Sequence, residues 1–318
     1  MHILILGAAG MIGQKLATAI AGGALPATHL TLADVILPPA PVFAGQMTTL
    51  ALNLTATDAP ACLLSAKPDI IFHLAAIVSA QAEADFDAGY ATNFDATRAL
   101  FDAIRLMPAY HPRVVFASSG AVFGAPFPDV VPDDFHLTPR SSYGTQKAMA
   151  ELLLADYTRR GFMDGIALRL PTICIRPGLP NAAASGFFSG ILREPLAGKR
   201  ANLPVRDTLR HWFASPRSAV GFFLHAATLN TTHLHGQIAL NMPGLSATVA
   251  DQIAALRAHA GDAAVALIDR VPDARIAAIV ETWAMAYDTR RATALGFTAE
   301  TSFDQILKVY LQDDATLA

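Results

Sequence analysis

The sequence predicts an α/β fold built on a doubly wound parallel sheet. Short apolar strands alternate with helical stretches through the first half of the chain, and the first strand runs directly into a glycine-rich turn. Apolar strands that alternate with helices indicate a parallel sheet covered on both faces. The alternation ends after Leu170, where Pro, Gly, Asn and Ser become frequent. This change predicts a smaller C-terminal region that covers the carboxyl ends of the strands, where such sheets bind ligands.

The apolar runs and their flanking residues give the expected elements in order. We expect strands at residues 3–6, 29–33, 47–52, 70–74, 114–117 and 166–170, with a later strand at 237–241 that returns to the sheet. We expect the main helices at residues 11–21, 94–107, 142–160, 249–260 and 302–311.

The glycine turn between the first strand and the first helix contains Gly7, Gly10 and Gly13. We expect Gly7 to allow a tight turn, Gly10 to let a pyrophosphate approach the backbone, and Gly13 to let the helix pack against the strand. Free N–H groups at the start of the helix would then face the pyrophosphate. A glycine turn alone is a weak signal, and its Gly-x-x-Gly-x-x-Gly spacing differs from the Gly-x-Gly-x-x-Gly of most dinucleotide dehydrogenases.

An acidic residue, Asp34, ends the second expected strand, 21 residues after Gly13. A carboxylate there accepts hydrogen bonds from both ribose hydroxyls of an adenosine and repels a 2′-phosphate. The alternative is a surface aspartate, but the context favours the cofactor role, and we predict NAD rather than NADP. We therefore assign residues 1–172 to a Rossmann-type NAD-binding domain, with its returning strand near 237–244. Residues 173–318 are assigned mainly to substrate binding.

Composition narrows the class of protein further. The chain has 318 residues with a formal net charge of −3 and 15% charged residues, and it has no basic stripe, so nucleic acid is excluded as a partner. The apolar N-terminus is interpreted as a strand rather than a signal peptide, and we expect no membrane-spanning segment. Cys62 and Cys174 lack the spacing of a metal site and are expected to be buried free thiols. These features predict a cytoplasmic protein that acts on small molecules and binds no metal.

A tyrosine and a lysine, Tyr143 and Lys147, lie four residues apart near the start of a predicted helix. Positions i and i+4 share one face of a helix. The tyrosine pKa is ordinarily near 10, and we expect the lysine ammonium to lower it. The pair can then take a proton from an alcohol or return one to a carbonyl. An ordinary amphipathic helix is the alternative.

Four further polar positions follow or lie within the expected strands and helices. Ser118 and Ser119 follow the strand 114–117. A hydroxyl there can hold the reacting oxygen of a substrate, or it can belong to a turn. Asn93 fits a helix N-cap, and His73, inside an apolar run, fits a buried core residue better than a general base.

Together these residues resemble the extended short-chain dehydrogenase/reductase family along nearly the whole chain. The shared motifs include His73-Leu-Ala-Ala76, Ser118-Ser-Gly-Ala-Val-Phe-Gly124, Tyr143-x-x-x-Lys147 and Asn241-Met-Pro-Gly244. The resemblance implies that Ser119, Tyr143 and Lys147 are catalytic and that Lys147 also holds the nicotinamide ribose. The positions implied to bind NAD are Gly7, Ala9, Gly10, Met11, Ile12, Gly13, Asp34, Asn53, Leu54, Leu74, Ala75, Ala76, Asn93, Ser118, Tyr143, Lys147, Pro171 and Thr172.

Departures from the family pattern bear on the substrate. Thr172 and Asn53 stand where sugar-nucleotide epimerases usually have Asn and Asp, and Arg210 is followed by His rather than by an acid. The segments 168–186 and 193–198 look most like a subgroup that oxidises the C2 hydroxyl of a four-carbon sugar acid with NAD. The residues then expected to bind substrate are Ser119, Tyr143, Arg176, Asn181, Ser185 and Arg210. Arg210 is our first expectation for the carboxylate, and Arg176 the second.

We therefore expect an NAD-dependent dehydrogenase of a sugar acid such as D-erythronate, with Tyr143 as the general base. The first alternative is a nucleotide-sugar epimerase or dehydratase, which shares the catalytic set but recycles tightly bound NAD. The second is a non-catalytic NAD sensor, which the retained Tyr/Lys pair disfavours. The resemblance also implies a homodimer formed through the helices at 94–107 and 142–160.

Overall fold

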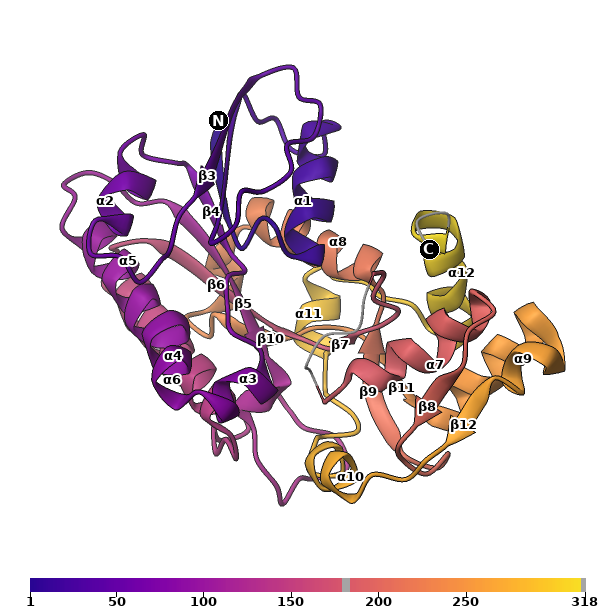
Figure 1. The fold of residues 1–318 in the computed structure, drawn as a ribbon. Helices are drawn as coiled ribbons and strands as arrows, with labels where there is room; N and C mark the ends of the chain where they lie inside the picture. The colour runs from indigo at the N-terminus through magenta and orange to yellow at the C-terminus, as the bar shows by residue number, and fades with distance from the viewer. Residues whose placement is uncertain (179–183, 316–318) are drawn as a thin grey trace.

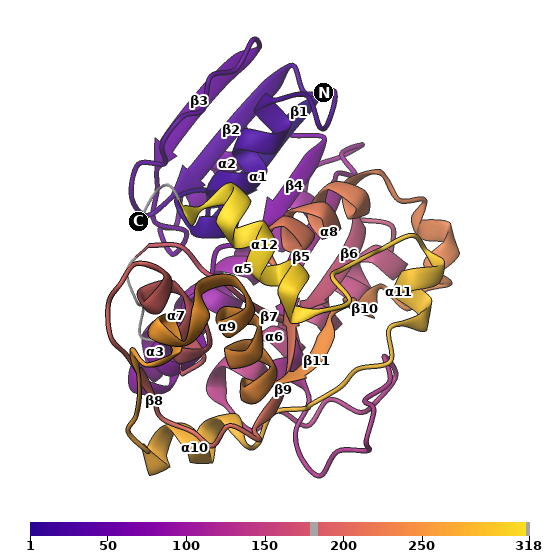
Figure 2. The same cartoon turned by 90° about the vertical axis from the view of Figure 1, so that its right-hand side faces the viewer.

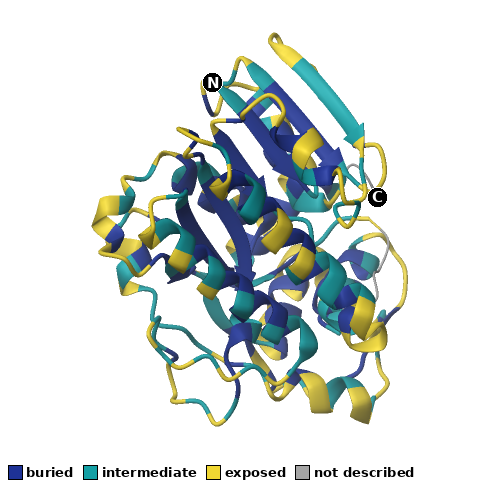
Figure 3. Ribbon diagram, turned by 90° about the vertical axis from the view of Figure 1, so that its left-hand side faces the viewer, coloured by how far each residue is buried: buried dark blue, intermediate teal, exposed yellow. Residues whose placement is uncertain are grey.

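The computed structural model describes residues 1–178 and 184–315. Its main sheet has seven strands in the order β10-β6-β5-β4-β1-β2-β3, and every neighbouring pair in it is parallel. The strands are β1 (His2–Leu6), β2 (His29–Asp34), β3 (Gln46–Ala51), β4 (Ile70–His73), β5 (Arg113–Ser119), β6 (Asp164–Leu170) and β10 (Ala239–Asn241). The predicted doubly wound sheet is confirmed, including the returning strand, and Figure 3 shows its central strands as buried.

Helices cover both faces of this sheet (Figure 1). One face carries α1 (Met11–Ala21) and α8 (Pro216–Thr228), and the other carries α2 (Ala59–Leu64), α5 (Ala96–Arg105) and α6 (Ser142–Arg159). The apolar side chains of α8 belong to the same core as β1 and β5. The C-terminal half of the chain thus adds both β10 and α8 to the NAD-binding domain that we assigned to residues 1–172.

The remaining elements form a second layer with its own apolar core around Phe188, Phe213, Leu256 and Leu307. It contains a three-stranded sheet, β11-β9-β7, and a two-stranded sheet, β12-β8, flanked by helices (Figure 2). These elements are β7 (Thr172–Ile173), α7 (Gly186–Leu196), β8 (Ala201–Leu203), β9 (Arg210–Ala214), β11 (Leu245–Thr248), α9 (Val249–Val265), β12 (Ile268–Arg270), α10 (Ala274–Val280) and α12 (Phe303–Asp313).

Short helical segments complete the structure: α3 (Ser79–Ala84), α4 (Phe86–Tyr90), α11 (Arg290–Ala294), a π-helical turn at Ala91–Asp95, and 3₁₀ turns at Gly120–Val122 and Thr231–Leu234. The π-helical turn precedes α5. The helix expected at 94–107 is therefore π-helical at its first two residues, and its α-helical part begins at Ala96. Asn93 lies inside that turn and is not an N-cap, which corrects our expectation. The helix expected to end at 260 continues to Val265, although Gly261 has a non-helical φ of 75°.

The two cysteines have different environments. Cys174 is buried as expected, but Cys62 is exposed because it lies on the outer side of the short helix α2, so the prediction of two buried thiols was wrong for Cys62. Within the described part of the chain, no helix is both long enough and apolar enough to cross a membrane.

Candidate active site

The glycine turn joins β1 to α1 at the carboxyl edge of the sheet. Gly7 has a φ of 84°, and a Cβ on it would lie 2.6 Å from the Ala75 backbone nitrogen. A Cβ on Gly13 would lie 2.7 Å from the Cα of Ala8, so α1 packs too closely on the turn for any side chain there. Gly10 is exposed at the N-cap of α1, which has neither a side-chain cap nor an acidic residue in its first turn. This end of α1 therefore offers backbone N–H groups to an anion.

Asp34, at the end of β2, lies beside this turn. One of its carboxylate oxygens accepts a hydrogen bond from the Ala9 backbone nitrogen at 2.9 Å, and the other accepts one from Val35 at 2.7 Å. The carboxylate is thus fixed next to the start of α1, within the arrangement that binds a pyrophosphate and a ribose together. The glycine cradle, the uncapped helix start and this carboxylate fit a dinucleotide.

Two loops that follow strands line the same edge. Asn53, after β3, is exposed, and its side-chain oxygen accepts hydrogen bonds from the Thr55 backbone and hydroxyl at 3.0 Å. After β4, the side chain of Asn93 holds the loop by accepting from the Ile77 nitrogen at 2.8 Å and donating to the Ile77 oxygen at 3.0 Å. The half-buried positions beside the turn on these loops and on α1 are Met11, Ile12, Leu54, Leu74, Ala75 and Ala76.

Tyr143 lies in the first turn of α6, where the Ser141 hydroxyl caps the helix by accepting from Gly144 at 3.0 Å. Burial raises the pKa of Tyr143 to about 12, while Ser119, within hydrogen-bonding reach, and the charge of Arg176 lower that pKa. Lys147 does not offset the effect of burial, because its ammonium is 5.7 Å from the centre of the Tyr143 ring and donates to the Ala117 carbonyl oxygen at 2.8 Å. The expected acidic tyrosine is therefore not produced by Lys147.

Lys147 is only 2% exposed. Burial lowers its pKa to about 8, and the negative charge of Glu151 raises that pKa. The side chain is in its charged form over most of the neutral range, next to the end of β5. This end also carries Ser118, which is buried, and Ser119, whose hydroxyl accepts from the Ala121 nitrogen at 3.2 Å.

His73, in the neighbouring strand β4, is buried against the edge of the Phe116 ring. Burial and the nearby Lys147 lower its pKa to about 3, and its Nε2 atom is 3.0 Å from the Thr97 hydroxyl. The ring is neutral and belongs to the core, in agreement with the interpretation that we preferred.

The candidate carboxylate ligands differ sharply in position. Arg176 is half-buried, donates from Nη2 to the Ser185 hydroxyl at 3.3 Å and from Nε to the Ile173 oxygen at 3.0 Å, and acts on Tyr143 through its charge. Arg210 is exposed at the start of β9, where it donates to the Ser246 oxygen at 3.0 Å. Asn181 lies outside the described residues. Arg176, Ser185, Ser119 and Tyr143 are thus brought together, and Arg210 is held on the surface.

Three residues at this site, His211, Glu151 and Arg169, were not predicted from the sequence. The Thr172 hydroxyl, after the buried Pro171, is 2.6 Å from Nε2 of His211, a buried ring whose pKa is lowered to about 3. Glu151 and Arg169 form a buried ion pair behind Lys147. Glu151 follows Lys147 by four residues, and this spacing was the one signal available for it.

The chain matches known proteins over most of its length. Residues 3–213 match the model of the NAD dependent epimerase/dehydratase family. A relative named D-erythronate dehydrogenase from Cupriavidus necator is 45% identical and covers 98% of both chains. Another of that name, from Haemophilus influenzae, is 42% identical over 99% of this chain and 100% of its own length.

Solved structures agree on the fold. The crystal structure described as a nucleoside-diphosphate-sugar epimerase from Agrobacterium tumefaciens is 56% identical, with a TM-score of 0.96 over 100% of this chain and 95% of that one. The family match spans both the glycine turn and the Tyr143–Lys147 pair. The chain belongs to the NAD dependent epimerase/dehydratase family and is an NAD-dependent oxidoreductase.

Proposed function

We propose that the protein oxidises the C2 hydroxyl of a four-carbon sugar acid, D-erythronate, to 2-dehydro-D-erythronate. Two relatives of nearly equal length carry the name D-erythronate dehydrogenase, which supports a dehydrogenase acting on a CH–OH group. The observation that carries the choice of an acid substrate is the position of Arg176, whose charge acts on Tyr143.

The geometry of a 2-hydroxy acid explains why this position matters. Its carboxylate is bonded directly to the carbon that bears the reacting hydroxyl, so the cation that holds the carboxylate must lie close to the proton acceptor. The effect of the Arg176 charge on the pKa of Tyr143 supports this role for Arg176, and a guanidinium binds a carboxylate through two parallel hydrogen bonds. Arg210, which we expected first, donates to Ser246 on the surface. We therefore assign the carboxylate to Arg176 and the neighbouring hydroxyls to Ser185.

The chain's own residues then handle the hydroxyl and its proton. NAD, held by the glycine turn and Asp34, would supply the hydride acceptor. Ser119 holds the C2 oxygen by a hydrogen bond, and Tyr143 takes the proton from it. Lys147, on the same face of α6, would hold the cofactor ribose through its ammonium.

A nucleotide-sugar epimerase is the second candidate, because the similar structure from Agrobacterium tumefaciens is described as one. Such a substrate brings a diphosphate, which needs several cations at the site. In the described C-terminal layer, many arginines are already engaged with carboxylates, which disfavours this reading. These pairs are Arg193–Glu194, Arg200–Asp269, Arg206–Glu281, Arg270–Asp207 and Arg275–Asp273.

The test is a panel of four- and five-carbon sugar acids and UDP-sugars, each incubated with NAD or NADP. The quantity measured is the net formation of reduced cofactor. We expect D-erythronate with NAD to be the preferred pair. The variant Tyr143→Phe should reduce the rate at least about 100-fold, because it removes the proton acceptor. The proposal would be overturned if none of the acids in the panel gave net NADH, or if a UDP-sugar were epimerised with no net formation of NADH.

Two further parts of the proposal concern the state of the protein. We assign it a homodimer formed through the surfaces of α5 and α6, and a cytoplasmic location, which fits the two free cysteines. Sedimentation analysis of the parent and of Leu152→Glu, a change at an exposed leucine of α6, tests the dimer. The variant should sediment as a monomer, and an unchanged dimer would exclude this surface.

A further inference from the structure

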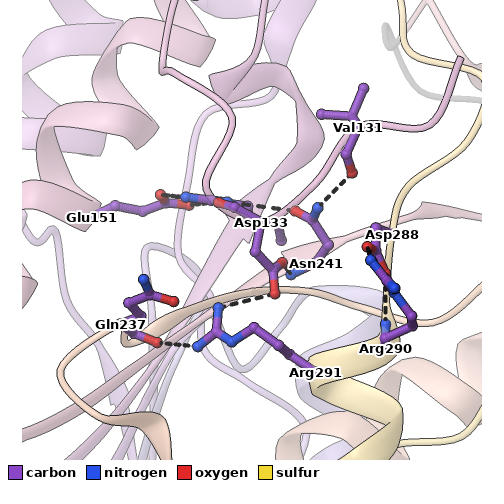
Figure 4. Close-up of polar contacts among 9 residues, drawn as sticks. Val131, Asp133, Glu151, Gln237, Asn241, Asp288, Arg290 and Arg291 are labelled. Atoms are coloured by element: carbon purple, nitrogen blue, oxygen red, sulfur yellow. Dashed lines mark hydrogen bonds and ion pairs between the residues drawn. The ribbon is translucent and has the colours of Figure 1, made fainter. Parts of the chain in front are cut away.

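A chain of buried polar groups lies behind the catalytic end of α6 (Figure 4). At its centre is Glu151, which is 3% exposed and lies one helical turn after Lys147. A buried carboxylate is costly unless charged and polar partners surround it. The partners of Glu151 come from β5 and β6, so the carboxylate connects α6 to both strands.

The first partner is Ser118, whose hydroxyl donates a hydrogen bond to Glu151. Ser118 directly precedes Ser119. Ala117 directly precedes Ser118, and its backbone oxygen accepts a hydrogen bond from the Lys147 ammonium at 2.8 Å. The end of β5 is thus tied to α6 at two successive positions. Both ties lie next to the hydroxyl that faces Tyr143.

The second partner is Arg169 on β6. Its guanidinium donates two hydrogen bonds to the Glu151 carboxylate, from Nη2 to Oε2 at 2.8 Å and from Nε to Oε1 at 3.0 Å. Arg169 also donates to the Asp133 backbone oxygen at 2.7 Å and lies 4.7 Å from the centre of the Phe123 ring. This pairing gives the buried Glu151 carboxylate a cationic partner that bonds both of its oxygens.

The chain of contacts continues away from the site. The Asp133 carboxylate accepts from the Asn241 nitrogen at 2.5 Å and from Arg291 at 3.0 Å, and Arg291 donates to the Gln237 oxygen at 2.8 Å (Figure 4). The pair Glu151–Arg169 is therefore supported on its outer side by β10 and α11. A supported pair holds one geometry, which suits a positioning role.

The charged and titratable groups around Lys147 come from three elements. Glu151 and Tyr143 lie on α6 itself, the neutral ring of His73 lies on β4, and Arg169 reaches Glu151 from β6. Among these groups, Glu151 is the one that raises the pKa of Lys147.

We propose that Glu151 is a positioning residue, which aligns the end of β5 with α6 through Ser118 and supplies the negative charge that favours the Lys147 ammonium. The inference rests on the proposed roles of Tyr143 and Lys147. Removal of this charge should lower the pKa of Lys147 below its value of about 8, because the effect of burial is then less opposed. Lys147 would lose its charge within the neutral range.

The experiment is an NMR titration of the full chain labelled with ¹³C at the lysine Cε, without substrate or cofactor, so the proposed reaction can fail without affecting the readout. Lys147→Arg assigns the signal. Glu151→Gln should lower the pKa of Lys147 by about one pH unit. Glu151→Asp should restore part of the shift, and Asp156→Asn, which changes an exposed residue on the same helix, should leave the pKa unchanged.

A lone Arg169 left buried by Glu151→Gln can prevent folding. The double variant Glu151→Gln/Arg169→Met removes both charges, and it should lower the pKa of Lys147 in the same direction. Ser118→Ala keeps the charge but cuts the tie to β5, and it should reduce kcat at least about tenfold with the pKa of Lys147 retained. An unchanged pKa in both variants that lack the carboxylate would overturn the charge role, and an unchanged kcat in Ser118→Ala would overturn the alignment role.

Discussion

Replacement of Arg176 by Met is the perturbation that best separates the proposed acid substrate from others. The methionine keeps the apolar part of the side chain, while the guanidinium that donates to Ser185 and Ile173 is lost. The half-buried position limits screening by water, so a substrate carboxylate would be left without its cation.

The magnitude follows from the cost of truncating one partner of a desolvated charge pair, which is about 2–5 kcal/mol. A loss of about 3 kcal/mol corresponds to about a 150-fold fall in kcat/KM for D-erythronate. A second effect acts through Tyr143. Because the charge of Arg176 lowers the pKa of that phenol, the variant should also need a higher pH to reach half of its maximal kcat/KM.

The assay is initial-rate NADH formation from D-erythronate between pH 6 and pH 10, for the parent and the variants Arg176→Met, Arg176→Lys and Arg210→Met. Arg176→Lys should recover part of the rate, since it keeps the charge without the two-pronged geometry. Arg210→Met should stay within about threefold of the parent, as expected for an exposed side chain. The reasoning is refuted if Arg210→Met causes the large loss and Arg176→Met does not.

Three other predictions concern the cofactor site and the buried lysine. Gly13→Ala should weaken NAD binding at least about tenfold in calorimetry, because its Cβ would lie 2.7 Å from the Cα of Ala8, whereas Gly22→Ala, at the other end of α1, should not; equal affinities would contradict the cradle. Asp34→Ala should lower kcat/KM with NAD about 100-fold and change that with NADP little, and a retained NAD preference would contradict the ribose role. Because burial lowers the pKa of Lys147 from 10.5 to about 8, its charging weakens the folded state below pH 8, and the free energy of unfolding should rise by roughly 3 kcal/mol between pH 8 and 10.5. Denaturant titrations at each pH should show a smaller rise in the free energy of unfolding for Lys147→Met than for the parent. An identical dependence of this free energy on pH in the two proteins would contradict the role of Lys147.

Sequence reasoning succeeded where the signal is local. The parallel sheet follows from apolar runs, and the family from the glycine turn and the Tyr143–Lys147 spacing, each of which lies within one turn or helix; the roles of the individual site residues stay predictions. The exposed Cys62 and the π-helical turn around Asn93 were missed, because the packing of neighbouring elements decides them.

The different surroundings of the two candidate arginines could not be predicted from the sequence. Arg176 and Arg210 both follow or begin apolar segments, and only in the fold does the charge of Arg176 lower the pKa of Tyr143 while Arg210 donates to Ser246 on the surface. The raised pKa of Tyr143 has the same origin, since burial by distant parts of the chain outweighs its sequence neighbours. Glu151 carried a helical-spacing signal, but its partner Arg169 reaches it only through the pairing of β5 with β6.

The most direct test of C2 oxidation uses D-erythronate that carries deuterium at C2. If C2 is oxidised as proposed, the deuterium is recovered on the NADH formed, with 2-dehydro-D-erythronate as the other product in equal amount. NADH without deuterium, or turnover of the acid with no net NADH, would contradict the proposal.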